Sequence, residues 1–393
     1  MVGAGLKSDS ISLGRTDLEM SDKSENEEHS PASEERDWPF WAKSQRIIKR
    51  GGLIDPGYLG ESDRRGCGWV REHFRSAKRA HSQGDFGDRI QDLSLFFINS
   101  DAVNAVALAL EERQGIGIHI GAVRKLWFLY QEALNSDTFL EGSFLQPLPP
   151  NPDRSSESAT FFRLWEEEAD HGWCEDRLDM FWDLFLRSLD FLVYHEIAHH
   201  TRGHIDLVLT RMGMSEIDEL FSMSASDGIS GELFRHLEFD ADHHAIDMML
   251  TAYDQEFPLE EWAEDHARAE CFLLSLSLIG VFQALDHEDR EVEAHYRTTH
   301  PAPVHRAMRL TGAVSRTIGR FAGWSDVERI EHHDNAWVAG AELAERSGRG
   351  RDRWMGTGTR RMAQDLFVEE EARFIAFSQA LDRINEKDSD EDK

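Results

Sequence analysis

An apolar stripe that runs directly into two histidines is the feature that most limits how this chain can fold. Between residues 181 and 192, apolar side chains recur at intervals of three and four, the spacing of one helix face: Phe181, Leu184, Phe185, Leu189 and Leu192. His195 and His199 continue this face, and Ser188 is the single small polar residue on it. The pattern predicts a helix whose buried side ends in two imidazoles.

The two histidines belong to the motif His195-Glu196-x-x-His199. Because residues four apart share a helix face, both imidazoles can reach one zinc ion at about 2.0–2.1 Å. Glu196 points in a neighbouring direction, where it can accept a proton from a water at the metal. The alternative interpretation is a hydrogen-bonded pair of histidines on a core helix, which could arise by accident in a chain with 19 histidines.

A second motif lies downstream in RHLEFDADHH, where Glu238 and Asp242 are four residues apart. A carboxylate that faces an apolar surface is costly unless it is paired or binds a metal, so Glu238 is the candidate third ligand. Asp242 could then accept a hydrogen bond from a ligand imidazole and fix its tautomer. The alternative is an amphipathic helix whose acids face solvent.

Composition narrows the range of partners and compartments. The formal net charge is −31, which disfavours nucleic acid, unless a local basic patch exists, and anionic membrane surfaces. The three cysteines lie far apart without a CxxC pair, as expected in a reducing compartment. The N-terminus lacks a signal-like apolar run, and the apolar window at 271–285 is short for a membrane span. We therefore expect a cytoplasmic protein without stable membrane insertion.

Helical periodicity dominates the chain, with one exception. The runs at 103–110 and 116–120 are β-like, and the EERQG between them predicts a hairpin turn. A helix over 122–134 should follow, so we expect an α+β fold that is predominantly helical with one small sheet. If the run at 116–120 were an edge strand beside the metal, a substrate could pair with it as an added strand.

At this point the sequence resembles a known family. HEIAHHTRGH followed by EFDAD is similar to the gluzincin metallopeptidases, in particular the HtpX/CAAX-prenyl-protease-like group, which carries HExxH on one helix and ExxxD on a second. Residues 104–108 with 116–123 resemble the strand pair of that group. THPAPVHR, at 299–306, resembles its THPxxxxR loop near the active site. The resemblance covers roughly residues 94–310.

The resemblance implies a zincin-like metallopeptidase core with His195, His199 and Glu238 as zinc ligands, Glu196 as catalytic base and Asp242 behind the ligands. Members of the group usually carry membrane helices or a secretory signal. A soluble chain with long flanks looks more like the phage-exclusion (Lit-type) peptidases, which cleave the host translation elongation factor Tu. The implied function is a soluble zinc-dependent endopeptidase. A narrower form of this hypothesis is a conditionally activated effector that cleaves a host protein.

Zinc-dependent hydrolysis of a protein or peptide substrate also needs a donor for the oxyanion. His300, in the THPAPVHR loop, is the first candidate, and His204 and Tyr194 are the next candidates. The competing hypothesis is a catalytically silent, zinc-stabilised scaffold or regulatory binding module. The intact Glu196 and the three evident ligands favour the enzyme, because structural zinc sites usually close four protein ligands.

The same reading divides the chain into five segments. An acidic N-terminal segment, 1–37, should be disordered, because little in it can be buried. A helical region at 38–90 precedes the metallopeptidase domain at 91–325, and a second helical region at 326–386 precedes an acidic tail at 387–393. The flanking helical regions are long enough to sense an activating partner, which no motif in them identifies.

Overall fold

The computed structural model describes residues 40–82, 87–111, 113–136, 139–140, 175–218, 228–286, 301–346, 354, 375–377 and 379. Its elements, in chain order, are α2 (Gln45–Lys49), η1 (Pro56–Tyr58), α3 (Glu61–His81), α4 (Gly87–Gln91), β1 (Ser94–Ile98), β2 (Ala105–Leu110), β3 (Arg113–His119), α5 (Ile120–Leu134), α6 (Glu175–Thr201), α7 (His204–Met212), β4 (Glu216–Asp218), α8 (Gly228–Glu256), η2 (Leu259–Glu261), α9 (Glu264–Leu285), α11 (Pro303–Phe321) and α12 (Asp326–Arg346). Helices dominate and one small sheet accompanies them, which confirms the α+β prediction.

The sheet has the strand order β1-β3-β2-β4, with β1 parallel to β3 and the other pairs antiparallel. The predicted hairpin is present as β2 and β3, and its turn includes Glu111 at φ 56°. The prediction that the run at 116–120 forms an edge strand is wrong, because β3 pairs with β1 on one side and β2 on the other. Within the described part of the chain, β4 lies at the edge next to β2.

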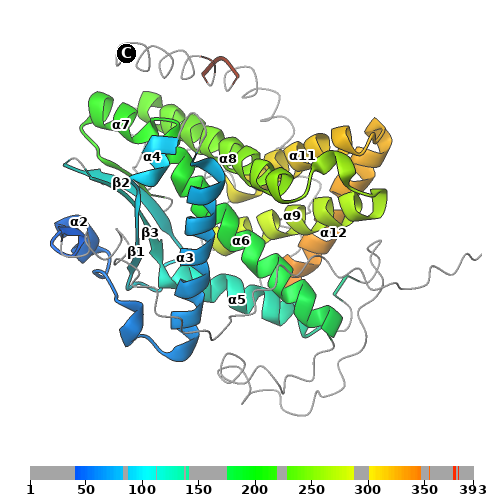
Figure 1. Ribbon diagram of the computed structural model, residues 1–393, viewed down its shortest axis with the longest axis horizontal. Helices are drawn as coiled ribbons and strands as arrows, with labels where there is room; N and C mark the ends of the chain where they lie inside the picture. Colours follow the sequence, from blue (N-terminus) through cyan, green and yellow to red (C-terminus); the bar gives the residue numbers. More distant parts are fainter. Residues whose placement is uncertain are drawn as a thin grey trace, which may run out of the picture.

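Helices cover the two faces of the sheet unequally (Figure 1). Alternate residues of β1 point to opposite sides. Phe96 and Ile98 pack with Trp41 and Ile47 next to α2, whereas Leu95 and Phe97 belong to the large core on the other side. That core is shared by the sheet and the long helices, so the sheet forms one wall of a mainly helical molecule.

The helix α6 lies at the centre of the helical part and packs against α3, α5, α8 and α9. Its predicted apolar stripe is buried from Phe181 to Leu192. Within this stripe, the Ser188 hydroxyl lies 2.6 Å from the Tyr130 hydroxyl, so the polar interruption has a buried partner. The helix that the sequence predicts to carry the two histidines is thus packed against other helices on several sides.

Both predicted flanking regions pack against the helices of the predicted metallopeptidase domain: α3 packs against α6, and α12 packs against α9. The domain boundaries expected near residues 90 and 325 stay predictions. Among the described residues, α9 is the one helix long and apolar enough to cross a membrane, but 89% of its apolar window is buried. That degree of burial is typical of the core helix of a soluble protein.

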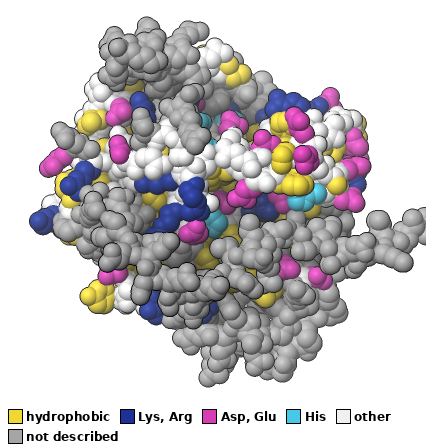
Figure 2. Space-filling model, viewed as in Figure 1, with side chains coloured by type: hydrophobic (Ala, Val, Ile, Leu, Met, Phe, Trp, Pro, Cys, Tyr) yellow, Lys and Arg dark blue, Asp and Glu magenta, His cyan; other side chains and the backbone are white. Residues whose placement is uncertain are grey.

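Net charge alone does not describe the surface. In Figure 2, Lys and Arg side chains gather over α3. This helix has six Lys and Arg residues against three acidic ones, although the whole chain has a net charge of −31. Part of this charge is balanced locally, because Arg79 forms a 2.8 Å ion pair with Glu72. The acidity of the chain is therefore unevenly distributed.

Candidate metal centre

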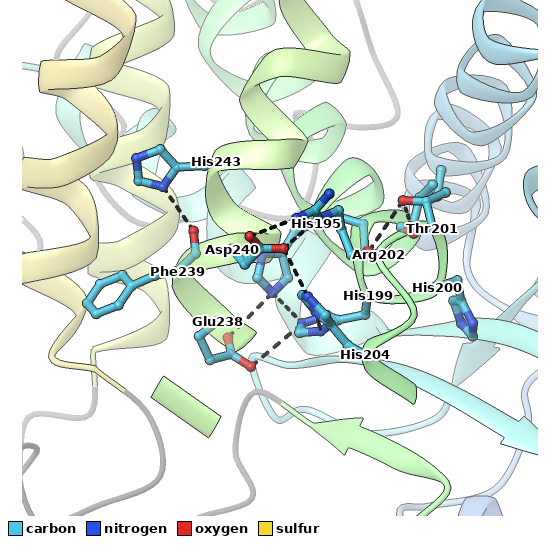
Figure 3. Close-up of polar contacts among 12 residues, drawn as sticks. His195, His199, His200, Thr201, Arg202, His204, Glu238, Phe239, Asp240 and His243 are labelled. Carbon is cyan, nitrogen blue, oxygen red and sulfur yellow. Dashed lines mark hydrogen bonds and ion pairs between the residues drawn. The ribbon is translucent and has the colours of Figure 1, made fainter. Parts of the chain in front are cut away.

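The two predicted motifs meet at the contact between α6 and α8. His195 and His199 come from the last two turns of α6, and Glu238 comes from α8 (Figure 3). The exposed fractions of the three residues are 1%, 1% and 0%. A carboxyl group and two imidazoles are thus withdrawn from water together, which is costly unless they bind or pair with something.

The spacing of the donor atoms fits a tetrahedral metal. The Nε2 atoms of His195 and His199 are 3.1 Å apart, and each lies 3.5 or 3.6 Å from a Glu238 carboxylate oxygen. Ligands of a tetrahedral zinc ion at 2.0–2.1 Å lie about 3.4 Å from one another. One donor atom from each residue falls within 4.8 Å of the others, so this buried cluster could hold a metal ion.

A second carboxylate and an arginine support the His195 side. Asp242 Oδ1 lies 3.0 Å from His195 Nδ1, the ring nitrogen that faces away from Glu238. Arg306, from α11, donates to both oxygens of Asp242 at 2.7 and 2.8 Å, and its Nη2 lies 3.2 Å from Glu238 Oε2. Burial alone would raise the pKa of Asp242, but Arg306 and His195 hold that pKa below its usual value. Asp242 therefore favours its ionised form beside His195.

A different set of residues supports His199. Its Nδ1 lies 3.0 Å from His204 Nδ1, and His204 Nε2 lies 3.0 Å from Asp240 Oδ2. Arg202 donates to both Asp240 oxygens, at 2.7 and 3.2 Å. Burial lowers the pKa of His204, and the hydrogen bond with Asp240 opposes part of this shift. Burial alone would raise the pKa of Asp240, but His204 and Arg202 hold that pKa well below its usual value.

The turn between α6 and α7 brings His204 to this position. Gly203 has φ 70° and ψ 20°, the left-handed conformation that glycine adopts without steric cost. Gly203 follows the end of α6 at Thr201 and precedes His204, the first residue of α7, whose side chain is fully buried. A continuous helix would have placed residue 204 about 140° around the axis from His199.

The remaining histidines of the two motifs lie elsewhere. His200 faces the sheet, where its Nε2 lies 3.1 Å from the Gly115 carbonyl oxygen, and burial lowers its pKa to about 4. His243 donates from Nδ1 to the Phe239 carbonyl oxygen of its own helix at 2.9 Å (Figure 3). Neither residue is part of the metal cluster in the described structure.

The structure thus brings together His195, His199 and Glu238, places Asp242 against His195, and buries Glu196 on the same helix. His300 lies outside the described residues, so its role stays a prediction. The structure describes the two other oxyanion candidates. Both ring nitrogens of His204 are engaged by neighbouring side chains, and Tyr194 packs edge-on against His81 of α3.

The sequence analysis did not single out Asp240, whose carboxylate contacts His204 and Arg202. Asp240 is two positions from Glu238, about 200° around the helix, so the four-residue period that selected Asp242 passes over it. The available signal was the pair Gly203-His204 directly after the first motif, since a helix-ending glycine followed by a histidine can turn an imidazole back toward the ligands. The sequence likewise shows Arg202 as a charged residue next to that turn, and it does not predict its contact with Asp240.

Comparison with known proteins supports a peptidase. Residues 146–316 match the family model described as Peptidase U49. The match spans less than half of the chain, and it contains all of α6 and α8 as well as Arg306. No curated protein and no solved structure gave a significant match. The region that supplies the buried cluster is therefore the region that resembles a peptidase family.

Proposed function

We propose that this chain is a soluble, cytoplasmic zinc-dependent endopeptidase in which Glu196 is the general base. The observation that carries the proposal is the buried His195, His199 and Glu238 cluster, whose donor spacing suits zinc and which lies inside the region that matches a peptidase family. A protein or peptide is the proposed substrate, and a zincin-like core of the gluzincin type is the proposed scaffold.

We assign the following roles to the residues of the site. A zinc ion held by His195, His199 and Glu238 would supply a Lewis acid that polarises a peptide carbonyl and acidifies water. We assign the role of general base to Glu196, which follows His195 on α6 and is 1% exposed: it would accept a proton from water and return it to the leaving amine. Asp242, 3.0 Å from His195 Nδ1, would accept its proton in a hydrogen bond and leave the Nε2 lone pair for the metal.

The charge balance of the site also favours a cation. The Arg306 guanidinium contacts the buried carboxylates of both Glu238 and Asp242, and it neutralises one of them. Glu196 adds another buried acid on the facing helix. A divalent cation would compensate the excess negative charge, and three protein ligands would leave the fourth tetrahedral position to water, as in catalytic zinc sites.

The finer assignment follows from the Lit-type resemblance. Soluble relatives of that kind act on a host protein, so we propose a protein substrate in the same cell and activation by a trigger. The enzyme is favoured over a zinc-stabilised scaffold, because a purely structural site has no use for the buried Glu196 beside the ligands.

The test compares the wild-type protein with Glu196→Gln, which keeps the shape of the side chain and removes its basicity. Zinc content is measured on purified protein, and new peptide N-termini are counted in a cell lysate and in phage-infected lysate. We expect about one zinc per chain in both proteins and new N-termini with the wild type only. Glu132→Gln, on the exposed side of α5, is the matched control and should behave as the wild type does.

Two outcomes would contradict the proposal. Wild-type protein that retains no zinc after purification in chelator-free buffer, and takes up none on addition, would exclude a metallopeptidase. Bound zinc without any new N-termini in either lysate would favour the scaffold hypothesis.

A further inference from the structure

We propose that His204 and Asp240 are positioning residues for the second metal-ligating histidine, His199, and that they set its tautomer through a chain of two hydrogen bonds. The inference rests on the proposed metal site and extends it to residues that the two sequence motifs do not include. The chain runs from Asp240 through both ring nitrogens of His204 to His199 Nδ1, with a 3.0 Å separation at each step.

The direction of the hydrogen bonds follows from the chemistry of the end groups. Asp240 is bound by two Arg202 nitrogens, so its carboxylate is an acceptor and the facing His204 Nε2 is a donor. A neutral His204 then presents the lone pair of Nδ1, and the Nδ1 of His199 must supply the proton. His199 Nε2 is left unprotonated, which is the form that a metal needs.

The opposite arrangement is incompatible with metal binding. If His204 donated from both nitrogens, His199 Nδ1 would be the acceptor and its proton would move to Nε2. That proton would point into the cluster, where His195 Nε2 lies 3.1 Å away. The hydrogen-bond chain therefore favours one tautomer of His199, as Asp242 does for His195.

The chain also fixes the position of the imidazole. Arg202 and His204, on either side of Gly203, both bind Asp240 of α8, so the end of α6 and the start of α7 are fastened to the helix that provides Glu238. Figure 3 shows His204 between His199 and Asp240. A displacement of this turn would displace the acceptor of His199.

The test measures zinc affinity by competition with a chromophoric chelator, so that it does not depend on a substrate. His204→Phe keeps a planar ring and removes the acceptor, and we expect a roughly tenfold to hundredfold weaker affinity, the usual effect of losing such a partner. His204→Asn places a carbonyl oxygen close to the position of Nδ1 and should restore most of the affinity. The matched control, His243→Phe on α8, should leave the affinity unchanged.

A double-mutant cycle tests whether the two residues act in series. Asp240→Asn should weaken zinc binding several-fold in the wild-type background and have no further effect in the His204→Phe background. The absorption spectrum of the cobalt(II)-substituted protein should change with His204→Phe, because it reports ligand geometry, and should be unaltered by the His243 control.

The outcomes separate this inference from the proposed function. If the wild type binds one zinc and folded His204→Phe binds it equally tightly, the positioning role is refuted while the metal site stands. If the wild type binds no zinc, both proposals fail. Should His204→Phe not fold, as judged by circular dichroism, Asp240→Asn decides: an unchanged affinity overturns the inference.

Discussion

The two histidines of the first motif occupy equivalent places on α6, yet they are supported in different ways. His195 meets a carboxylate directly, and Arg306 fixes that carboxylate, Asp242, from α11. His199 meets another imidazole, and the carboxylate, Asp240, stands one residue further away. The His195 side therefore depends on an arginine from α11, and the His199 side depends on the turn that follows α6 and its contacts with Asp240.

This difference shows how one helix can contact the surroundings of two candidate metal ligands. The helix α8 supplies Asp242 on the face that meets His195 and Arg306, and Asp240 on the side that meets the turn after α6. A carboxylate in direct contact polarises an imidazole more strongly than one acting through a neutral ring. We therefore expect the His195 side to contribute more to metal affinity and the His199 side to respond more to changes in the turn.

The largest effect should follow removal of Arg306. Arg306→Leu leaves Glu238 and Asp242 buried without their guanidinium, and loss of one partner of a buried ion pair costs about 3–5 kcal/mol. Urea unfolding of the metal-free protein should show this loss, and zinc should reverse part of it by balancing the carboxylates. Arg316→Leu, an exposed position on the same helix, is the control. A metal-free stability equal to that of the wild type would contradict the role of this ion pair.

An intermediate effect should distinguish the two carboxylates. Asp242→Asn retains an acceptor for His195 but loses the charge, so zinc affinity should fall about 10- to 100-fold. Asp240→Asn acts through His204 and should weaken the affinity by less. Chelator competition on both variants gives the ranking. The comparison drawn above would be wrong if Asp240→Asn proved the more damaging substitution.

The smallest effect concerns the stability of the folded protein in acid, and it comes from a histidine close to Arg306. His305, beside Arg306, packs edge-on against Phe239, and burial, with a further contribution from Arg309, lowers its pKa to about 3. The unfolded chain takes up a proton near pH 6.5 and the folded chain does not, so this histidine reduces stability as pH falls from 6.5 toward 3. Above pH 6.5 it has no such effect.

His305→Phe should therefore flatten the acid side of the stability profile by about one proton, or about 1.4 kcal/mol per pH unit between pH 4.5 and 6. Urea unfolding of the metal-free protein across this range provides the measurement. An identical slope in both proteins would mean that His305 is protonated in the folded state.

Much of the site could be predicted because its main signals follow the helical period. The apolar stripe on α6 and the four-residue spacings of His195 with His199 and of Glu238 with Asp242 identify faces without knowledge of the fold. The hairpin of β2 and β3 was visible from its turn. These features are local, so the sequence contains them in full.

The rest depends on contacts between distant segments. The strand β1 is buried on both faces, so its sequence SLFFI lacks the alternation that identifies a strand, and its parallel pairing with β3 is long-range. Missing β1 led to the wrong prediction of an exposed β3 edge. Asp240 was missed because its partner His204 follows Gly203, a glycine in the left-handed conformation. Such a glycine changes the direction of the chain, and helical periodicity does not predict that change.

The three acids of α8 at positions 238, 240 and 242 share a single rigid backbone, and each contacts a different set of side chains. Glu238 lies beside both histidines of the first motif and Arg306, Asp240 beside Arg202 and His204, and Asp242 beside His195 and Arg306. Deleting one residue between the first and the last would turn everything beyond it by about 100° and shift it by about 1.5 Å. No side-chain rearrangement could realign all three contacts at once. A single exchange in this short segment should therefore weaken one contact at a time, whereas a change in length should disrupt all three.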